Sequence, residues 1–433
     1  MLWTLDSGLW TLDVFCSGRF LLWTLDPGLW TFFALDSGLW TLDGICAMAS
    51  DNDYILEIED LKTYIYDAKN RGFHRLVDGV SFRVPRGKTT AVVGESGSGK
   101  STVAYSLLGL EPDVPGVISG RMDLTVAGER IEMLSHLPGA CRVEENEGVV
   151  RVAKDGRRWR KQLGYEAVMQ RVRGRHISLM MQEARSALNP YQPIRQQVRE
   201  AYLIGGGEEA DANEMVGFLF KELHIYDKAD EFPHNLSGGT CHRAMMAVAF
   251  AANPDLLIAD EPTTGLDCPI QIKVVDLLQR FKEGELMPNV SGHARSMMLI
   301  SHQIEIVEKL SDDVVVMYGG KVLETGTADE ILEGDVRHPY TEKIVQIYRE
   351  PPEISSQDSL ERLVSIPGFV PSTLTWVKGC RFANRCESRM AVCDRVPPPL
   401  LPVGEGSNHC IACHLYHEAA AAAPVGEAAE SRV

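Results

Sequence analysis

The hydrophobic pattern of the chain predicts short strands that alternate with helices. From Tyr54 onward apolar and polar residues alternate as in a strand with one buried face, and residues 80–84 alternate again before Pro85. Residues 89–93 form a short apolar run typical of a strand, and residues 100–110, after the next loop, have the pattern of a helix. A strand, a glycine-rich loop and a helix therefore follow one another.

Three further apolar runs are short enough to be strands, at residues 177–181, 256–259 and 297–300. Each is apolar enough to be buried on both faces, which is typical of parallel strands covered by helices. The pattern therefore predicts an α/β fold built on a largely parallel sheet.

Residues 121–176 are less regular than the rest. An acidic patch there is followed by a basic patch, and the charged residues are Glu144, Glu145, Glu147, Arg151, Lys154, Arg157, Arg158, Arg160 and Lys161. A docking surface is one interpretation, but we favour a solvated helical insertion. The alanine-rich tail, residues 418–433, is predicted to be disordered.

The first 47 residues repeat a short apolar sequence. Leu-Trp-Thr-Leu-Asp begins at positions 2, 9, 22 and 39, with a partial copy at 29. A hydrophobic anchor or a repeat array are two interpretations, but the irregular period is too short for known solenoid units, and a signal peptide would need a basic start. We expect residues 1–47 to be a repetitive leader that is not native, with Met48 as the true start.

Composition narrows the class of protein. The chain has 433 residues, enough for a main domain with an appendage, and a formal net charge of -17. Such a charge argues against nonspecific binding to nucleic acid, which needs a basic surface. No uncharged run of about twenty apolar residues is present, so the sequence predicts no membrane span and places any membrane-linked role on the aqueous side.

Residues 94–101 match the pattern G-x-x-x-x-G-K-[ST] of a phosphate-binding loop. Its glycines let backbone N–H groups surround the β- and γ-phosphates of ATP at the positive end of the next helix. Lys100 adds a point charge, and the Ser101 hydroxyl can bind Mg²⁺. A chance match is disfavoured by the flanking strand and helix. The loop residues expected to bind ATP are Gly94, Ser96, Gly97, Ser98, Gly99, Lys100, Ser101 and Thr102.

Two carboxylates follow the apolar run at 256–259. Asp260 ends the predicted strand, where it can hold Mg²⁺ through water, and Glu261 can act as the general base that polarises the attacking water. A solvated strand end is the alternative. The segment Pro262-Thr-Thr-Gly-Leu-Asp267 comes directly afterwards.

Between the loop and the acidic strand stands Leu236-Ser-Gly-Gly239. Together the three motifs resemble the ATP-binding subunit of an ABC transporter. The resemblance implies that two copies clamp ATP head to tail, with Ser237, Gly238 and Gly239 reaching the partner's ATP and Asp267 in the loop that couples the two sites. Thr240 departs from the family, which usually has Gln or Met there.

The same resemblance implies roles for residues that carry little signal alone. Gln182, after residues 177–181, matches a glutamine that touches Mg²⁺ and the attacking water. His302 matches the switch histidine that contacts the γ-phosphate. Tyr64 or Tyr66 is expected to stack on adenine. The implied fold is a RecA-like core sheet with an antiparallel β subdomain and a helical signature subdomain, over residues 48–335.

The carboxyl-terminal third carries His338-Pro-Tyr-Thr341, Ile366-Pro-Gly-Phe-Val-Pro371 and five cysteines from Cys380 to Cys413. This series resembles the cysteine-rich extension of the oligopeptide and dipeptide branch of ABC importers, here over residues 336–417. Thiolates gathered on loops suit a metal or an iron–sulfur cluster, although free thiols in a small core are an alternative. By resemblance a [4Fe–4S] cluster is expected on four of them, with Cys410 as a spare: Cys380, Cys386, Cys393 and Cys413.

The resemblance implies an ATP-hydrolysing subunit, peripheral at the cytoplasmic face of the membrane, that energises an importer of peptides, or of nickel or oligosaccharides. Its expected partners are a second ATPase subunit, two transmembrane permease subunits and an extracytoplasmic solute-binding protein, with no nucleic acid. One alternative is a soluble ABC-type ATPase of translation or DNA repair. Another is a redox-sensing ATPase built around the cysteines.

Overall fold

The computed structural model of the protein forms two compact units, Met1–Ile45 and Cys46–Val433. The described residues are 2–6, 9–16, 19–26, 29–32, 53–110, 115–135, 141–146, 149–154, 162–286, 294–349, 366, 368–374, 378–404 and 407–416. The predicted disordered tail, Glu147 and most of the basic patch at 155–161 lie outside them. No helix of the described residues is long and apolar enough to cross a membrane.

The repeats of the first unit form one antiparallel sheet in chain order. Its strands are β1 (Leu2–Asp6), β2 (Leu9–Cys16), β3 (Arg19–Asp26) and β4 (Leu29–Phe32). The register pairs Thr4 with Thr11, Thr11 with Thr24, and Thr24 with Thr31, so equivalent positions of the repeat lie opposite one another. That this segment is not native stays a prediction.

The second unit is built on an eight-stranded sheet with the order β12-β13-β14-β7-β15-β16-β18-β17. Its first five strands are parallel: β12 (Ile177–Met180), β13 (Leu256–Asp260), β14 (Ser296–Ile300), β7 (Thr89–Val93) and β15 (Asp313–Tyr318). Every residue of β7, β13 and β14 is buried, which confirms the predicted parallel core.

The cysteine-rich segment completes the other edge of this sheet. β16 (Lys321–Thr327) pairs antiparallel with β15 on one side and with β18 (Cys410–Ile411) on the other, and β17 (Leu401–Pro402) pairs with β18. The prediction of a distinct cysteine-rich extension is therefore corrected. The segment belongs to the main unit because it satisfies the backbone groups that β16 would otherwise leave at an open edge.

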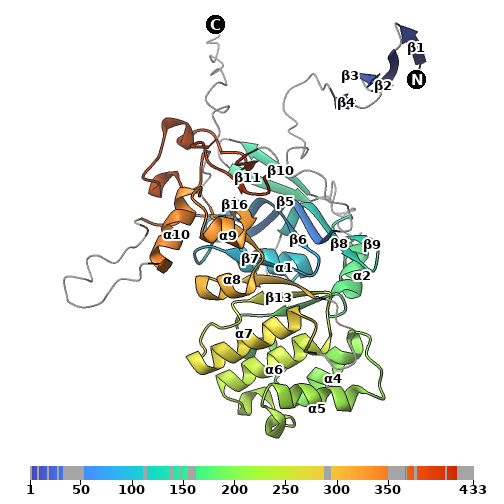
Figure 1. The fold of residues 1–433 in the computed structure, drawn as a ribbon, viewed down its shortest axis with the longest axis vertical. Coiled ribbons are helices and arrows are strands. Elements are labelled where there is room, and N and C mark those ends of the chain that lie inside the picture. Colours follow the sequence, from blue (N-terminus) through green and yellow to red (C-terminus); the bar gives the residue numbers. More distant parts are fainter. Residues whose placement is uncertain are drawn as a thin grey trace, which may run out of the picture. The chain divides into compact units, whose positions relative to one another are not determined.

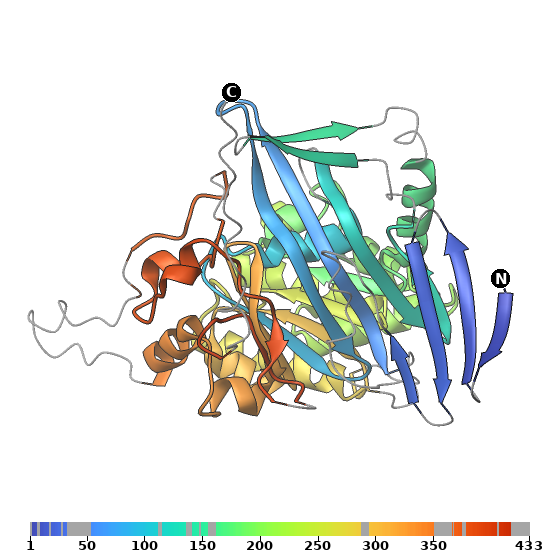
Figure 2. The same ribbon diagram turned by 90° about the horizontal axis from the view of Figure 1, so that it is seen from above.

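A second, antiparallel sheet has the order β6-β5-β8-β9, the predicted β subdomain. Its strands are β5 (Tyr54–Asp67), β6 (Gly72–Pro85), β8 (Pro115–Val126) and β9 (Glu129–Glu132). Figure 2 shows β5 and β6 in blue beside β8, with the carboxyl-terminal residues in red to one side.

The predicted helical insertion at 121–176 is mostly wrong. β8 and β9 begin it, the hairpin of β10 (Cys141–Asn146) and β11 (Val149–Lys154) follows, and among the described residues of this segment only α2 (Gln162–Val172) is a long helix. β8 forms because Met122 and Leu124 alternate with polar residues and are buried where the strand pairs with β5. In the hairpin Glu144 lies opposite Arg151, so the acidic and basic patches fall on paired strands.

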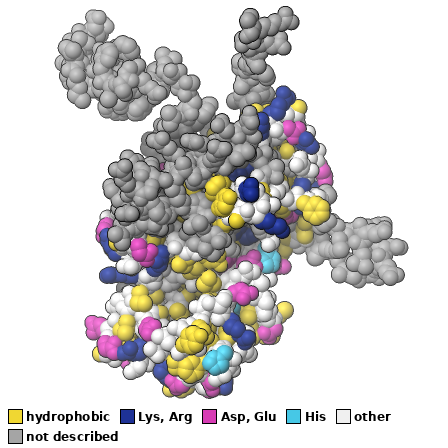
Figure 3. Space-filling view, turned by 180° about the vertical axis from the view of Figure 1, so that it is seen from behind, with side chains coloured by type: hydrophobic (Ala, Val, Ile, Leu, Met, Phe, Trp, Pro, Cys, Tyr) yellow, Lys and Arg dark blue, Asp and Glu magenta, His cyan; other side chains and the backbone are white. Residues whose placement is uncertain are grey.

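Helices cover the parallel sheet, and the larger ones gather below β13 in Figure 1. The remaining helices are α1 (Lys100–Leu108), α3 (Ala184–Ala187), α4 (Ile194–Ile204), α5 (Ala212–Glu222), α6 (Gly238–Ala251), α7 (Cys268–Lys282), α8 (Ile304–Leu310), α9 (Ala328–Leu332) and α10 (Pro339–Arg349). Single 3-10 turns lie at Tyr226–Lys228, Pro233–Asn235, Ala383–Arg385 and Ala391–Asp394. Acidic and basic side chains are interspersed over the helical part at the bottom of Figure 3.

Candidate functional site

The glycine-rich loop joins the end of β7 to the start of α1 and packs against two other backbone segments. Gly94 and Gly99 have φ values of 150° and 101°. A Cβ at Gly94 would lie 2.1 Å from the carbonyl oxygen of Met317, and one at Gly99 would lie 2.3 Å from that of Leu76. Both positions therefore require glycine for space as well as for backbone conformation.

Lys100 lies inside this loop. Its Nζ donates to the carbonyl oxygens of Gly94 and Glu95, at 2.8 and 3.0 Å, and lies 3.4 Å from Ser98 Oγ. Burial holds the pKa of Lys100 below its usual value, although Glu261 and Asp260 oppose the shift. The ammonium is thus placed where the phosphates of a nucleotide in the loop would be neutralised. Ser96 and Gly97 are exposed, and Thr102 is half-buried on α1.

Asp260 is fully buried at the end of β13 and faces the start of α1. Ser101 Oγ donates to its Oδ1 at 3.1 Å, whereas its Oδ2 is buried without a hydrogen-bond partner among the described residues. Burial, with a contribution from Glu261, raises the pKa of Asp260 to about 6. A hydroxyl beside a carboxylate with an unsatisfied oxygen is a donor set that suits Mg²⁺.

Glu261 and His302 form the next pair, at the ends of the neighbouring strands β13 and β14. His302 Nδ1 lies 2.9 Å from Glu261 Oε2, and Thr264 Oγ1 donates to the same oxygen at 2.7 Å. Burial opposes the charge of Glu261, but the hydrogen bonds from Thr264 and His302 outweigh it and lower its pKa. The φ of Glu261 is 50°, a strained conformation for a residue with a side chain. The site therefore holds an ionised carboxylate in a fixed position.

The signature residues begin α6. Ser237 Oγ accepts from the backbone N–H of Thr240 at 3.3 Å and lies 2.8 Å from the Thr240 hydroxyl. Ser237 and Gly238 are exposed, and Gly239 is half-buried. Thr240, unusual at this position, thus fixes the Ser237 side chain as the cap of the helix.

Two other predicted residues are exposed. Gln182 follows β12, and Asp267 is the N-cap residue of α7. Among the described residues, neither Gln182 nor the signature forms a hydrogen bond or ion pair with the phosphate loop, whereas Lys100, Ser101, Asp260, Glu261 and His302 are brought together.

Tyr64 does not suit its predicted role. Its ring is 2% exposed, and its hydroxyl donates to Asp78 Oδ1 at 2.6 Å. A ring so enclosed offers no face to adenine, so the prediction is corrected for Tyr64. Tyr66 is 46% exposed and packs against Phe73, with 5.2 Å between ring centroids, so it stays a candidate.

Sequence analysis missed the residues that hold the phosphate loop from outside. The backbone N–H of Glu95 donates to the Tyr340 hydroxyl at 2.8 Å, and Arg385 forms an ion pair with the Glu95 carboxylate at 2.6 Å. The only sequence signal was Tyr340's place in His338-Pro-Tyr-Thr341, because neither partner lies near Glu95 in the chain. A cavity of ≈ 360 Å³ beside the loop is lined by Gly94, Glu95, His302 and residues of α10.

The four predicted cysteines lie within electrostatic reach of one another, and none forms a disulfide. Cys380 donates its backbone N–H to the carbonyl oxygen of Cys393 at 2.7 Å. Burial, with a contribution from the neighbouring thiols, raises the pKa of Cys380 and of Cys413 to about 11. No group of three or more His, Cys, Asp or Glu side chains within the described ranges could hold a single metal ion.

The loop, Asp260, Glu261 and His302 on a parallel sheet define a phosphate-loop nucleoside triphosphatase. Comparison with known proteins identifies the family within this class. The sequence model of the ABC transporter family matches residues 77–264, and that of the oligopeptide/dipeptide transporter C-terminal region matches residues 323–393.

Two relatives match this chain over nearly the whole of their own length. The chain is 34% identical to the oligopeptide transport ATP-binding protein AppD of Bacillus subtilis, over 84% of this chain and 97% of the relative. It is also 34% identical to a putative peptide import ATP-binding protein of Brucella ovis, over 85% and 98%. A dimeric bacterial ABC transporter cassette is 17% identical, covers 63% of this chain and 98% of its own, and has a TM-score of 0.48. The protein belongs to the ATP-binding subunits of ABC transporters of the oligopeptide/dipeptide family, and is an ABC transporter ATPase.

Proposed function

We propose that this protein hydrolyses ATP to energise the import of peptides. The observation that carries the proposal is the cluster of Lys100, Ser101, Asp260, Glu261 and His302 at one edge of the parallel sheet. The names of the relatives, which refer to oligopeptide transport and peptide import, support peptides over nickel or oligosaccharides as the solute.

The cluster supports a division of roles among its side chains. Lys100, within the loop, neutralises the β- and γ-phosphates. Ser101 and Asp260 would hold Mg²⁺, which would screen the charge of the phosphates. The unpartnered oxygen of Asp260 fits this role, and Gln182 at the end of β12 is proposed to complete it.

Glu261 is the proposed general base for water. Its lowered pKa keeps it ionised, and its Oε2 accepts from Thr264 while Oε1 stays available for the water. His302, exposed beside it, orients the carboxylate and is proposed to contact the γ-phosphate. Because the pair is held at 2.9 Å, both groups are placed before substrate arrives.

The exposed signature supports a composite site made by two ATPase subunits. Ser237, Gly238 and Gly239 present backbone N–H groups at the start of α6, where the helix dipole favours an anion. We propose that they bind the γ-phosphate held by the loop of a second subunit, with Asp267 at the junction. ATP would then close the dimer, and hydrolysis would reopen it.

The remaining partners follow from the family. They are two transmembrane permease subunits, which would hold the protein at the cytoplasmic face of the membrane, and an extracytoplasmic solute-binding protein.

Tyr66 is the proposed adenine-stacking residue.

We also propose a [4Fe–4S] cluster on Cys380, Cys386, Cys393 and Cys413. The thiols lie within electrostatic reach, yet they do not surround a single-ion site, where zinc–sulfur bonds would be about 2.3 Å. The raised pKa values of Cys380, Cys386 and Cys413 keep these thiols protonated without a metal, and iron would stabilise the thiolates. Anaerobic purification with iron and sulfide analysis tests the cluster, and one zinc per colourless chain would refute it.

Glu261→Gln tests the catalytic assignment. The variant should bind ATP and dimerise in its presence, while turnover falls by about 10²–10⁴-fold, the contribution of a general base. Glu214→Gln, an exposed glutamate on α5, is the matched control. Normal turnover in Glu261→Gln would contradict the assignment, and failure to co-purify with permease subunits would contradict the transport role.

A further inference from the structure

A second cavity lies apart from the phosphate loop, between the antiparallel sheet, β16 and the cysteine-rich segment. Its volume is ≈ 940 Å³. Strands β5, β6 and β8 form one wall, β16 forms a second, and residues 378–381 and 395–400 form the third. The volume falls within the range of small-molecule sites, about 300–1,000 Å³.

The side chains that line this cavity are mostly basic. Asp78 is the only carboxylate among the described lining residues. It accepts hydrogen bonds from Tyr64, at 2.6 Å, and from the buried guanidinium groups of Arg75, at 3.1 Å, and Arg381. The basic lining residues are Lys62, Arg75, Lys321, Lys378, Arg381 and Arg395.

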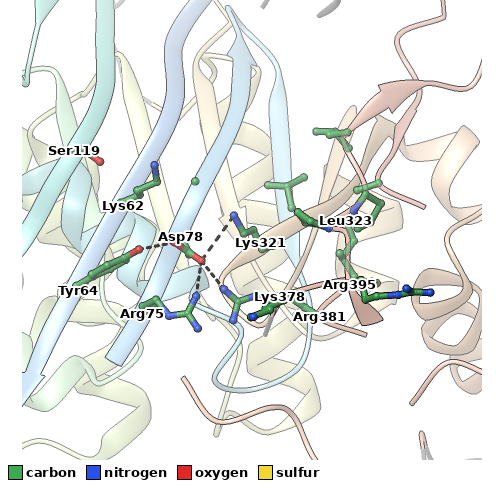
Figure 4. A pocket seen from close by; sticks show the side chains of 18 of the residues that line it. Lys62, Tyr64, Arg75, Asp78, Ser119, Lys321, Leu323, Lys378, Arg381 and Arg395 are labelled. Carbon is green, nitrogen blue, oxygen red and sulfur yellow. Dashed lines mark hydrogen bonds and ion pairs between the residues drawn. The ribbon is translucent and has the colours of Figure 1, made fainter. Parts of the chain in front are cut away.

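Figure 4 shows Tyr64, Arg75, Lys321 and Arg381 directed at Asp78, with Lys378 and Arg395 at the side of the cysteine-rich segment. Lys321 Nζ lies 3.8 Å from the same carboxylate. Lys62 is paired with Asp60 at the exposed edge, at 2.8 Å. One carboxylate thus faces two buried arginines and a half-buried lysine, which leaves the described wall with surplus positive charge.

The burial of the two arginines and the pKa of Arg75 also indicate a surplus of positive charge. Arg75 is 2% exposed and Arg381 is 7% exposed. Burial and the neighbouring Arg381 lower the pKa of Arg75 to about 10. Asp78 already lies between the two guanidinium groups, and its single negative charge compensates only part of the positive charge of Arg75, Arg381 and Lys321.

We propose that this cavity binds a small phosphorylated anion. Arginine forks match phosphate oxygens in geometry and charge, and Ser119 offers a hydroxyl group in the same wall. Lys378 and Arg395, both exposed, lie where they would attract the anion. The same chemistry is offered by a soluble phosphorylated metabolite and by a lipid headgroup.

The cavity is connected to the ATP site through the backbone. Asp78 donates its N–H to the carbonyl oxygen of Gly320 at 2.9 Å, and Gly320 donates its own to that of Ser98 in the phosphate loop at 3.0 Å. A ligand at Asp78 would therefore lie two backbone hydrogen bonds from the phosphate loop.

Isothermal titration with pyrophosphate, in saturating ADP without magnesium, tests the site while the phosphate loop is filled. The wild-type protein should bind one further equivalent. Lys378→Glu with Arg395→Glu should weaken this binding about tenfold or more, because each change replaces an attracting cation with a repelling carboxylate. Lys221→Glu with Lys309→Glu, exposed lysines away from the cavity, is the control of equal charge.

Sedimentation with phosphatidylglycerol and phosphatidylcholine vesicles distinguishes the sources. Binding to phosphatidylglycerol alone, lost in the cavity variant, would assign the site to a headgroup, and pyrophosphate binding alone would assign it to a soluble anion. Absence of both, or equal weakening in the control variant, would overturn the proposal. Because binding is measured without hydrolysis, failure here leaves the ATPase assignment untouched.

Discussion

Arg385, the residue before Cys386, forms a bidentate ion pair with Glu95 in the phosphate loop. Nη1 lies 2.6 Å from Glu95 Oε2, and Nη2 lies 3.0 Å from Oε1. Nη1 also donates to the Tyr318 hydroxyl at 3.1 Å, so the end of β15 belongs to the same contact. A bidentate pair is more specific in geometry than a single ion pair. The cysteine-rich segment therefore holds the loop that binds ATP.

We expect Arg385→Ala to raise the KM for ATP and to lower the free energy of unfolding by about 1.5–3 kcal/mol, because charged hydrogen bonds are lost and Glu95 is left half-buried. ATPase kinetics and urea unfolding measure both effects. Arg389→Ala is the matched control, since its ion pair with Asp394 is exposed. An unchanged KM in Arg385→Ala would show that the contact does not shape the loop.

Thr240 is the residue of the signature that departs from the family, and its contacts explain why it can stand there. Its hydroxyl and backbone N–H both meet Ser237 Oγ. Thr240→Val keeps the shape but loses the hydroxyl, so we expect ATP-dependent dimerisation to weaken by about 0.5–1.5 kcal/mol, the net value of one hydrogen bond. Thr240→Ser should restore it. Equal dimerisation of the valine and serine variants, measured by light scattering with Glu261→Gln in the background, would contradict the role.

The buried charge of Asp260, which the proposed Mg²⁺ site needs, lowers the free energy of unfolding of the protein. Its pKa of about 6, raised from 3.8, means that the ionised form is penalised by about 3 kcal/mol at most. The penalty is present above pH 6 and vanishes below pH 3.8. We therefore expect Asp260→Asn to unfold at a higher temperature than the wild type at pH 7.5 without magnesium, and to lose protection by Mg-ATP. Asp276→Asn, exposed on α7, should change neither quantity. A lower melting temperature in Asp260→Asn would contradict the penalty.

The local parts of the site were predictable because each lies next to its own strand. Asp260 and His302 come at the ends of adjacent parallel strands, so their proximity follows from the order of apolar runs. Tyr64 was not predictable, since β5 shifts register against β6 between Ile58 and Leu61 and again between Thr63 and Tyr64. Each shift changes which side chains face the core.

Contacts between segments that are distant in the chain could not be predicted from the sequence either. Nothing local indicates that Arg385 reaches Glu95 or that Cys410 pairs with Thr325 of β16. Such contacts depend on how the finished elements pack. The helical interpretation of 121–176 failed for a related reason, because the strand pattern of β8 becomes decisive only once β5 is there to pair with it.

His338 gives a prediction for acid stability. It is 1% exposed, its Nδ1 accepts from the backbone N–H of Tyr340 at 3.0 Å, and burial lowers its pKa to about 3. The neutral ring is favoured in the folded state, whereas the unfolded state takes a proton below about pH 6.5. The free energy of unfolding therefore falls by up to about 1.4 kcal/mol per pH unit as the pH drops from 6.5 toward 3.

We expect His338→Gln to flatten this slope, because glutamine can accept the same hydrogen bond but does not titrate. Urea unfolding at pH 7, 6 and 5 measures it, with His234→Gln, an exposed histidine, as the control. The variant should be less stable than the wild type at pH 7, and the gap should narrow at pH 5. Parallel pH profiles for His338→Gln and the wild type would show that His338 becomes charged in the folded protein.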